Sequence, residues 1–143
     1  MIVSRYPYNP ILTKDDVPYP VATVHNAAVV KHQDQYIMVF RSHTMNGRSI
    51  LGKAVSEDGY HFEVNEKPFM VPAVQGIFKE YETYGVEDPR IVFMEGEYLI
   101  TYSAYSQLGV RLGLRQTTDF VNIERVGTHR DLIVDDLPLL ARA

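Results

Sequence analysis

The chain of 143 residues contains no cysteine, which excludes disulfide bonds, thiol catalysis and cysteine-ligated zinc. No apolar run approaches the ~20 residues that a membrane-spanning helix requires. The first residues also lack the apolar core of a secretory signal peptide. These absences predict a soluble, cytoplasmic protein with no membrane partner.

Excess positive charge is missing as well. The 14 Lys and Arg residues are outnumbered by 18 Asp and Glu, which gives a formal net charge of -4. Neutralising a phosphate backbone requires a cationic surface, so nucleic acid is not an expected partner. The five histidines show no metal-ligand spacing such as His-x-x-x-His, which argues against a zinc site. Phosphate-binding loops, dinucleotide fingerprints and Gly-x-Ser-x-Gly motifs are also absent.

The residues that are present favour strands over helices. The chain has 10 Tyr and 6 Phe with many Val and Ile, interrupted by 8 Pro and 9 Gly. Four prolines between Arg5 and Pro20 predict an extended N-terminal arm. Asn46-Gly47 and Asp58-Gly59 are strong hairpin signals. The sequence therefore predicts an all-β fold that begins with four short antiparallel strands, at residues 27–31, 36–41, 49–55 and 60–64.

This four-stranded pattern recurs further along the chain. The segment around Tyr36 aligns with the segment around Tyr98, 62 positions later, and Leu51-Gly52 aligns with Leu112-Gly113 at a spacing of 61. A repeated four-stranded unit is typical of β-propeller blades, whereas similar composition in two unrelated meanders is the alternative. The predicted organisation is an arm at 1–24, a first blade at 25–65, a connecting loop at 66–86, a second blade at 87–127 and an aberrant or truncated third-blade start at 128–143.

The repeat places Asn26 and Asp88 at equivalent positions, each just ahead of an innermost strand. In a propeller these positions lie at the mouth of the central channel. Because side chains alternate along a strand, we expect Asp88 and Arg90 to face the channel and Glu87 to face away from it. A partly desolvated carboxyl group near other acids can retain a proton and act as a general acid. Capping of the turn before Pro89 is the alternative role for Asp88.

Arginines and tyrosines supply further candidates for a ligand site. Arg41, Arg48 and Arg111 follow strands or turns, and guanidinium groups bind phosphate or sugar hydroxyls in bidentate fashion. Most surface arginines do neither, so a solvated role is the alternative for each. Tyr102 and Tyr105 are candidates to stack on a sugar ring, or else to pack within the sheet.

Several segments, in order along the chain, resemble glycoside hydrolase family 130. This family comprises β-mannoside phosphorylases and related β-mannosidases built on five-bladed β-propellers. The resemblance runs from about Arg5 to Val126. The segments that carry it are Val24 to Ala28, Phe40 to His43, Asn46 to Ser49, Ser56 to Phe62, Gly85 to Ile91, Tyr98 to Ser106 and Gly109 to Arg111.

The resemblance implies an inverting reaction on a β-1,4-linked mannoside oligosaccharide. Inorganic phosphate, as co-substrate, attacks the anomeric carbon and α-mannose 1-phosphate is released. Asp88 would donate the proton through a sugar hydroxyl, which agrees with the wide spacing that inverting enzymes need. Asn26 and Arg41 would hold the sugar, and Arg111 would attract phosphate. Arg48 and Arg90 would be supporting groups, and no metal or organic cofactor is implied.

The C-terminal residues depart from the family pattern. From residue 128 onward the sequence does not match the expected start of a third blade. We therefore expect about two blades and a stub, with activity that belongs to a complete protein. Two alternatives stay open: a β-mannosidase that uses water, and a non-catalytic carbohydrate-binding or assembly module. An incomplete propeller exposes a sheet face, so a homo-oligomer is also expected.

Overall fold

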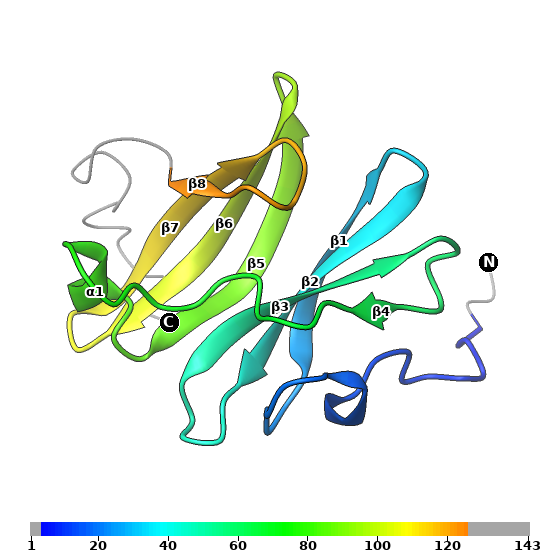
Figure 1. The fold of residues 1–143 in the computed structure, drawn as a ribbon, viewed down its shortest axis with the longest axis horizontal. Coiled ribbons are helices and arrows are strands. Elements are labelled where there is room, and N and C mark those ends of the chain that lie inside the picture. Colours follow the sequence, from blue (N-terminus) through cyan, green and yellow to red (C-terminus); the bar gives the residue numbers. More distant parts are fainter. Residues whose placement is uncertain (1–3, 126–143) are drawn as a thin grey trace, which may run out of the picture.

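The computed structural model describes residues 4–125, and the expected third-blade start at 128–143 lies outside the described residues. The all-β expectation is confirmed, because the only helices in the described part are short. No helix there is long and apolar enough to cross a membrane. The elements, in chain order (Figure 1), are η1 (Lys14–Asp16), β1 (His25–His32), β2 (Gln35–His43), β3 (Ser49–Ser56), β4 (Glu63–Val64), α1 (Phe78–Tyr81), β5 (Gly85–Met94), β6 (Glu97–Ser106), β7 (Gly109–Thr117) and β8 (Glu124–Arg125).

The strands form two antiparallel meanders of the same design. β1 to β4 make the first unit and β5 to β8 the second, each pairing in chain order. A single parallel bridge between Ser49 and Gly85 links the units through β3 and β5. Figure 1 shows them as two twisted sheets side by side. The structure therefore has the repeated four-stranded unit that the sequence predicted.

The turn before the outermost strand is built identically in both units. In the first, the Asp58 carboxylate accepts hydrogen bonds from the backbone N–H groups of Tyr60 and His61, both at 2.8 Å. In the second, Asp119 accepts from the N–H groups of Val121 and Asn122, also at 2.8 Å. A carboxylate that satisfies successive backbone donors fixes a tight reversal of the chain.

The main core lies between the two units. Val39 and Leu51 of the first unit pack with Val86, Ile100 and Tyr102 of the second, and all five are buried. The opposite face of the first unit buries Met38, Phe40 and Ala54 beneath the arm, which contributes Ile11, Leu12 and Val17. The arm is thus a structural layer, and the first unit is covered on both faces.

Glycines at repeat-equivalent positions make room for an aromatic ring in each unit. A Cβ at Gly52 would collide with the Phe40 ring, and a Cβ at Gly113 would collide with the Tyr102 ring. Phe40 lies opposite Gly52 in the β2–β3 ladder, and Tyr102 lies opposite Gly113 in the β6–β7 ladder. The matching Leu-Gly pairs in the sequence therefore have a packing reason.

Glu82 anchors the connection between the units. Its side chain is fully buried and accepts hydrogen bonds from the Tyr102 hydroxyl at 2.7 Å and from the Ala73 N–H at 2.7 Å. The Arg125 guanidinium lies 3.1 Å from its Oε2 and the Arg115 guanidinium 3.9 Å from its Oε1. A buried carboxylate needs such partners to offset its lost hydration, so this contact ties the connection to β6, β7 and β8.

Candidate functional site

The site forms where the innermost strand of each unit carries a β-bulge. In β1, two residues separate His25 from Ala28 while one separates their partners in β2, and β5 repeats this between Glu87 and Arg90. The bulged residues Asn26 and Asp88 have φ of 46° and 48°. Asn and Asp are the residue types, after Gly, that best tolerate this left-handed conformation. The two bulges therefore present one polar side chain each at equivalent points of the repeat.

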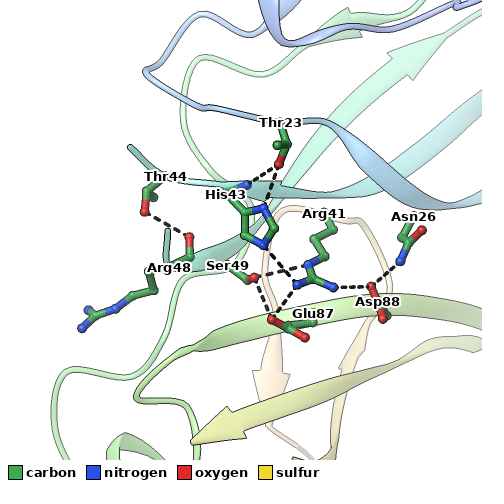
Figure 2. A network of polar contacts seen from close by, with 9 residues as sticks. All are labelled: Thr23, Asn26, Arg41, His43, Thr44, Arg48, Ser49, Glu87 and Asp88. Atoms are coloured by element: carbon green, nitrogen blue, oxygen red, sulfur yellow. Dashed lines mark hydrogen bonds and ion pairs between the residues drawn. The ribbon is translucent and has the colours of Figure 1, made fainter. Parts of the chain in front are cut away.

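The Arg41 side chain of β2 forms hydrogen bonds with polar groups from both units (Figure 2). Its guanidinium donates to Glu87 Oε1 at 2.8 Å, to Asp88 Oδ1 at 3.1 Å and to Ser49 Oγ at 3.2 Å. Asn26 Nδ2 donates to the same Asp88 oxygen at 2.7 Å. The side chains of Arg41 and Glu87 are largely buried, at 17% and 14% exposure, whereas Asp88 is 35% exposed. Asp88 is thus the carboxylate of this network that is most open to a ligand.

The expectation that Glu87 and Asp88 cannot face the same site is wrong. Both carboxylates bind the Arg41 guanidinium, and Figure 2 shows both directed toward it. Alternation of side chains holds only for a regular strand, and the bulge at Asp88 adds one residue that breaks it. Arg90 is exposed, and its Nη1 donates to the carbonyl of Pro89 at 2.8 Å. Glu87 and Ser49 are therefore site residues that the sequence reasoning missed.

Two histidines flank Arg41. His43 Nε2 lies 3.1 Å from Arg41 Nη2, and its Nδ1 lies 3.0 Å from Thr23 Oγ1. A guanidinium has only donors, so Nε2 must accept and Nδ1 carries the proton. The His25 ring lies 5.1 Å from the His43 ring. Burial, followed by the nearby Arg41 and His43, lowers the pKa of His25 below its ordinary 6.5.

The electrostatics of Asp88 differ from the sequence expectation of a retained proton. Burial alone would raise the pKa of Asp88, but hydrogen bonds from Asn26 and Arg41 and the charges of Arg41 and Arg90 outweigh it. The pKa of Asp88 therefore lies below the ordinary 3.8, so the carboxyl is ionised near neutral pH.

An open cleft of about 500 Å³ adjoins this network. Tyr84 and Tyr105 form one wall, with ring centroids 5.2 Å apart in an edge-to-face arrangement and about two-fifths of each side chain exposed. Arg48 also lines the cleft, although Figure 2 shows its guanidinium directed away from Asp88. The lining residues are Arg41, His43, Asn46, Gly47, Arg48, Thr83, Tyr84, Glu87 and Tyr105. The cleft combines charged groups with exposed aromatic faces, as ligand sites commonly do.

Two predicted residues lie elsewhere. Tyr102 is 1% exposed and donates to Glu82, so the prediction that it binds substrate is wrong and Tyr105 is the tyrosine that reaches the cleft. Arg111 lies on β7 opposite Ala104, and its Nη1 donates to the carbonyl of Val110 at 3.1 Å. Its role toward phosphate stays a prediction.

Within residues 4–125 no three His, Asp or Glu side chains are grouped so as to hold a metal ion.

Comparison with known proteins identifies the family to which this chain is similar. The model of the glycoside hydrolase 130 family, described as beta-1,4-mannooligosaccharide phosphorylase, matches residues 3–139. A beta-1,2-mannobiose phosphorylase of Listeria innocua is 43% identical over 74 residues, covering 52% of this chain and 19% of that protein. A 1,2-beta-oligomannan phosphorylase of Thermoanaerobacter sp. is 30% identical over 131 residues, covering 85% of this chain and 43% of that protein.

Solved structures agree with the sequence comparison. The beta-1,2-mannobiose phosphorylase from Listeria innocua, solved with beta-1,2-mannobiose, aligns with a TM-score of 0.73 at 25% identity over 87% of this chain and 50% of that one. The chain therefore spans about half or less of the length of these relatives. Their fold is the five-bladed β-propeller, of which the described residues form two blades. By sequence and by structure, the chain belongs to glycoside hydrolase family 130.

Proposed function

We propose that this chain supplies the proton donor and part of the sugar subsite of an inverting β-mannoside phosphorylase. The observation that carries the proposal is the hydrogen bond between Asn26 and Asp88, from equivalent bulges of two blades, at a carboxylate that also binds the Arg41 guanidinium. The left-handed backbone explains an Asn or Asp at each bulge, but it does not require the two side chains to bind each other beside Arg41. Their convergence beside an open cleft supports a binding role.

Arg41 and Asn26 would hold the mannose ring through its hydroxyls. A guanidinium and an amide both donate hydrogen bonds, and Asp88 accepts them. A sugar hydroxyl can do both, so it can enter the network between these groups and satisfy each of them. Glu87 and Ser49 already fix the far side of the guanidinium, which keeps its orientation when the sugar binds.

The sugar would also change the protonation of Asp88. Entry of a neutral hydroxyl separates Asp88 from Arg41 and displaces water, and both changes raise the pKa of a carboxyl group. Protonated Asp88 then gives its proton to a mannose hydroxyl, which passes its own proton to the glycosidic oxygen. Phosphate forms the new bond to the anomeric carbon from the opposite face as the glycosidic bond breaks.

Binding of phosphate calls for cationic groups in addition to Arg41. Arg41 is already opposed by two carboxylates, so it is a poor phosphate ligand. Arg111 stays our candidate for attracting phosphate, with Arg48 of the cleft wall as a second cation. Groups contributed by other parts of a complete propeller would complete the phosphate site.

Product analysis tests the proposal. A propeller of full family length that contains this chain is incubated with β-1,4- and β-1,2-mannobiose, with and without inorganic phosphate, and α-mannose 1-phosphate is measured. We expect phosphate-dependent product from one linkage, reduced at least 100-fold in Asp88→Asn because the acid is lost. Asp34→Asn, at an exposed hairpin turn, is the matched control and should retain wild-type turnover. Mannose release that ignores phosphate would make the protein a mannosidase, and unchanged turnover in Asp88→Asn would remove Asp88 from the mechanism.

A further inference from the structure

A cluster of three tyrosines, two of them exposed and one half-buried, lies at the other end of the first unit. Tyr6 and Tyr8 come from the arm and Tyr60 comes from the turn between β3 and β4. The Tyr6 ring lies 4.6 Å from the Tyr60 ring and 5.5 Å from the Tyr8 ring. Tyr8 is 77% exposed and Tyr60 is 51% exposed. Large aromatic faces are thus held in contact with one another while they remain open to solvent.

These rings border an open hollow of about 550 Å³. Its remaining walls combine apolar and acidic side chains. They come from the arm and from the segment that leads into β4: Pro10, Ile11, Asp16, His61, Phe62 and Glu63. Concave surfaces with aromatic walls and a few polar groups are the usual form of a small-ligand site.

The aromatic rings are not required to build the turn or to attach the arm. The equivalent turn of the second unit has the same Asp-centred hydrogen bonds, yet it carries Val121 and Asn122 where the first has Tyr60 and His61. The arm is attached by buried apolar side chains of its own, among them Ile11. An account based on folding alone therefore leaves Tyr8 and Tyr60 unexplained.

The charges of the hollow restrict its ligand. Asp16 and Glu63 line it, whereas none of the described residues that line it is a Lys or an Arg, so an anion such as phosphate is disfavoured. His61 Nδ1 lies 2.7 Å from the Asp58 carboxylate, and this hydrogen bond holds the pKa of Asp58 well below its usual range. Aromatic faces pack against the C–H face of a sugar, and carboxylates accept hydrogen bonds from its hydroxyls. The aromatic and carboxylate side chains that line the hollow therefore suit a neutral oligosaccharide.

The hollow is separate from the cleft at Arg41. Ser49, which begins β3, contacts Arg41, whereas the tyrosine turn follows Ser56, which ends the strand. A strand of this length separates the two by roughly 23 Å at about 3.3 Å per residue. One monosaccharide cannot reach both sites.

We propose that Tyr6, Tyr8 and Tyr60 form a second, non-catalytic binding site for a neutral oligosaccharide. A sugar ring stacks on Tyr60 and Tyr8, and its hydroxyls donate to Glu63 and Asp16 at the rim. The site itself rests on the geometry of the hollow, and only the choice of a β-mannoside as its ligand rests on the proposed function. Such a site would retain a long substrate while the cleft acts on its end.

An NMR titration of the protein with β-mannotetraose, followed at the tyrosine ring protons, tests this site. The titration is made in the Arg41→Gln background, which weakens sugar binding at the cleft. We expect saturable shifts at Tyr6, Tyr8 and Tyr60, with affinity reduced about tenfold in Tyr60→Ala and retained in Tyr60→Phe, which keeps the stacking ring. Val121→Ala, at the equivalent turn of the second unit, is the control and should not change the affinity.

The possible outcomes separate the two proposals. Shifts at the three tyrosines would support this site even if the separate product assay showed no phosphorolysis, which is the result that removes the proposed function. An unshifted tyrosine cluster at saturating sugar would overturn this site, whatever the cleft does. Saturation by tetramethylammonium but not by mannotetraose would also overturn it, because the cluster would then be a cation cage.

Discussion

Arg41 is the residue on which the site depends. Its guanidinium meets two carboxylates, one hydroxyl and one imidazole, and these groups come from both units. Hydrogen bonds between charged groups in a partly buried position are stronger than those at a surface, so the network orients Asp88 before a ligand arrives. The same charge that orients Asp88 also keeps it ionised.

Replacement of Arg41 by Gln should therefore raise the pKa of Asp88. The folded-state pKa of Asp88 is lowered, so its interactions stabilise the protein above the ordinary Asp pKa of 3.8 and this contribution is lost as pH falls through the lowered value. Carboxyl ¹³C titration should show a higher pKa for Asp88 in Arg41→Gln, and urea unfolding should show a loss of about 2 kcal/mol at pH 7. Arg90→Gln is the control, with a smaller pKa change. An unaltered Asp88 pKa in Arg41→Gln would contradict this account of the site.

The strands and turns show how far the sequence could be interpreted. Hairpin signals and the spacing of Tyr36 and Tyr98 predicted the strands, because local turn chemistry and alternation are encoded locally. The equivalence of Asn26 and Asp88 was also predicted from spacing. The side-chain directions around Asp88 were not, because a bulge changes alternation and depends on pairing with a distant strand.

Tyr102 shows a second limit of sequence reasoning. The local sequence around an aromatic residue on a strand does not show whether its side chain is buried or exposed. For Tyr102, burial depends on the connection between the two units. Glu82 lies in that connection and has no local pattern that predicts burial, yet it contacts the Tyr102 hydroxyl from the far side of the core. Burial and the Glu82 charge raise the pKa of Tyr102 to about 12.

The Glu82 contact makes a testable contribution to stability. In Glu82→Gln the Arg115 and Arg125 guanidinium groups lose their buried counter-charge, so we expect a loss of about 3 kcal/mol in the free energy of unfolding. The pKa of Tyr102, followed by ultraviolet titration, should fall toward 10. Glu80→Gln, exposed in α1, is the matched control. A stability equal to that of the control would show that the connection is held by other contacts.

The two units are covered unequally, which affects the behaviour of the protein as a whole. The first unit buries Ile37 and Leu51 against the second. Their repeat equivalents in the second unit are Leu99 and Leu112, and on that face Leu112 is 39% exposed and Val92 is 53% exposed. In a propeller this face packs against the next blade. The described part of the chain leaves apolar side chains of this face exposed.

The 143-residue chain should therefore self-associate through this face. Sedimentation velocity across a range of concentrations should show reversible oligomers, because burial of apolar surface favours association. Leu112→Glu should shift the population to monomer, whereas Val121→Glu, at an exposed position of a turn, should not. A monomer at every concentration would mean that the open face is tolerated in solution.

The central claim is that equivalent bulges of two blades form one sugar subsite, and a double-mutant cycle on mannose binding tests it most directly. Affinity is measured by NMR titration for Asn26→Ala, Asp88→Asn, the double variant and the wild-type protein. If both side chains bind the same sugar, each single change should weaken binding about tenfold or more, and the double variant should lose much less than the product of the two effects. Independent effects that multiply, or binding that survives both changes, would contradict the claim.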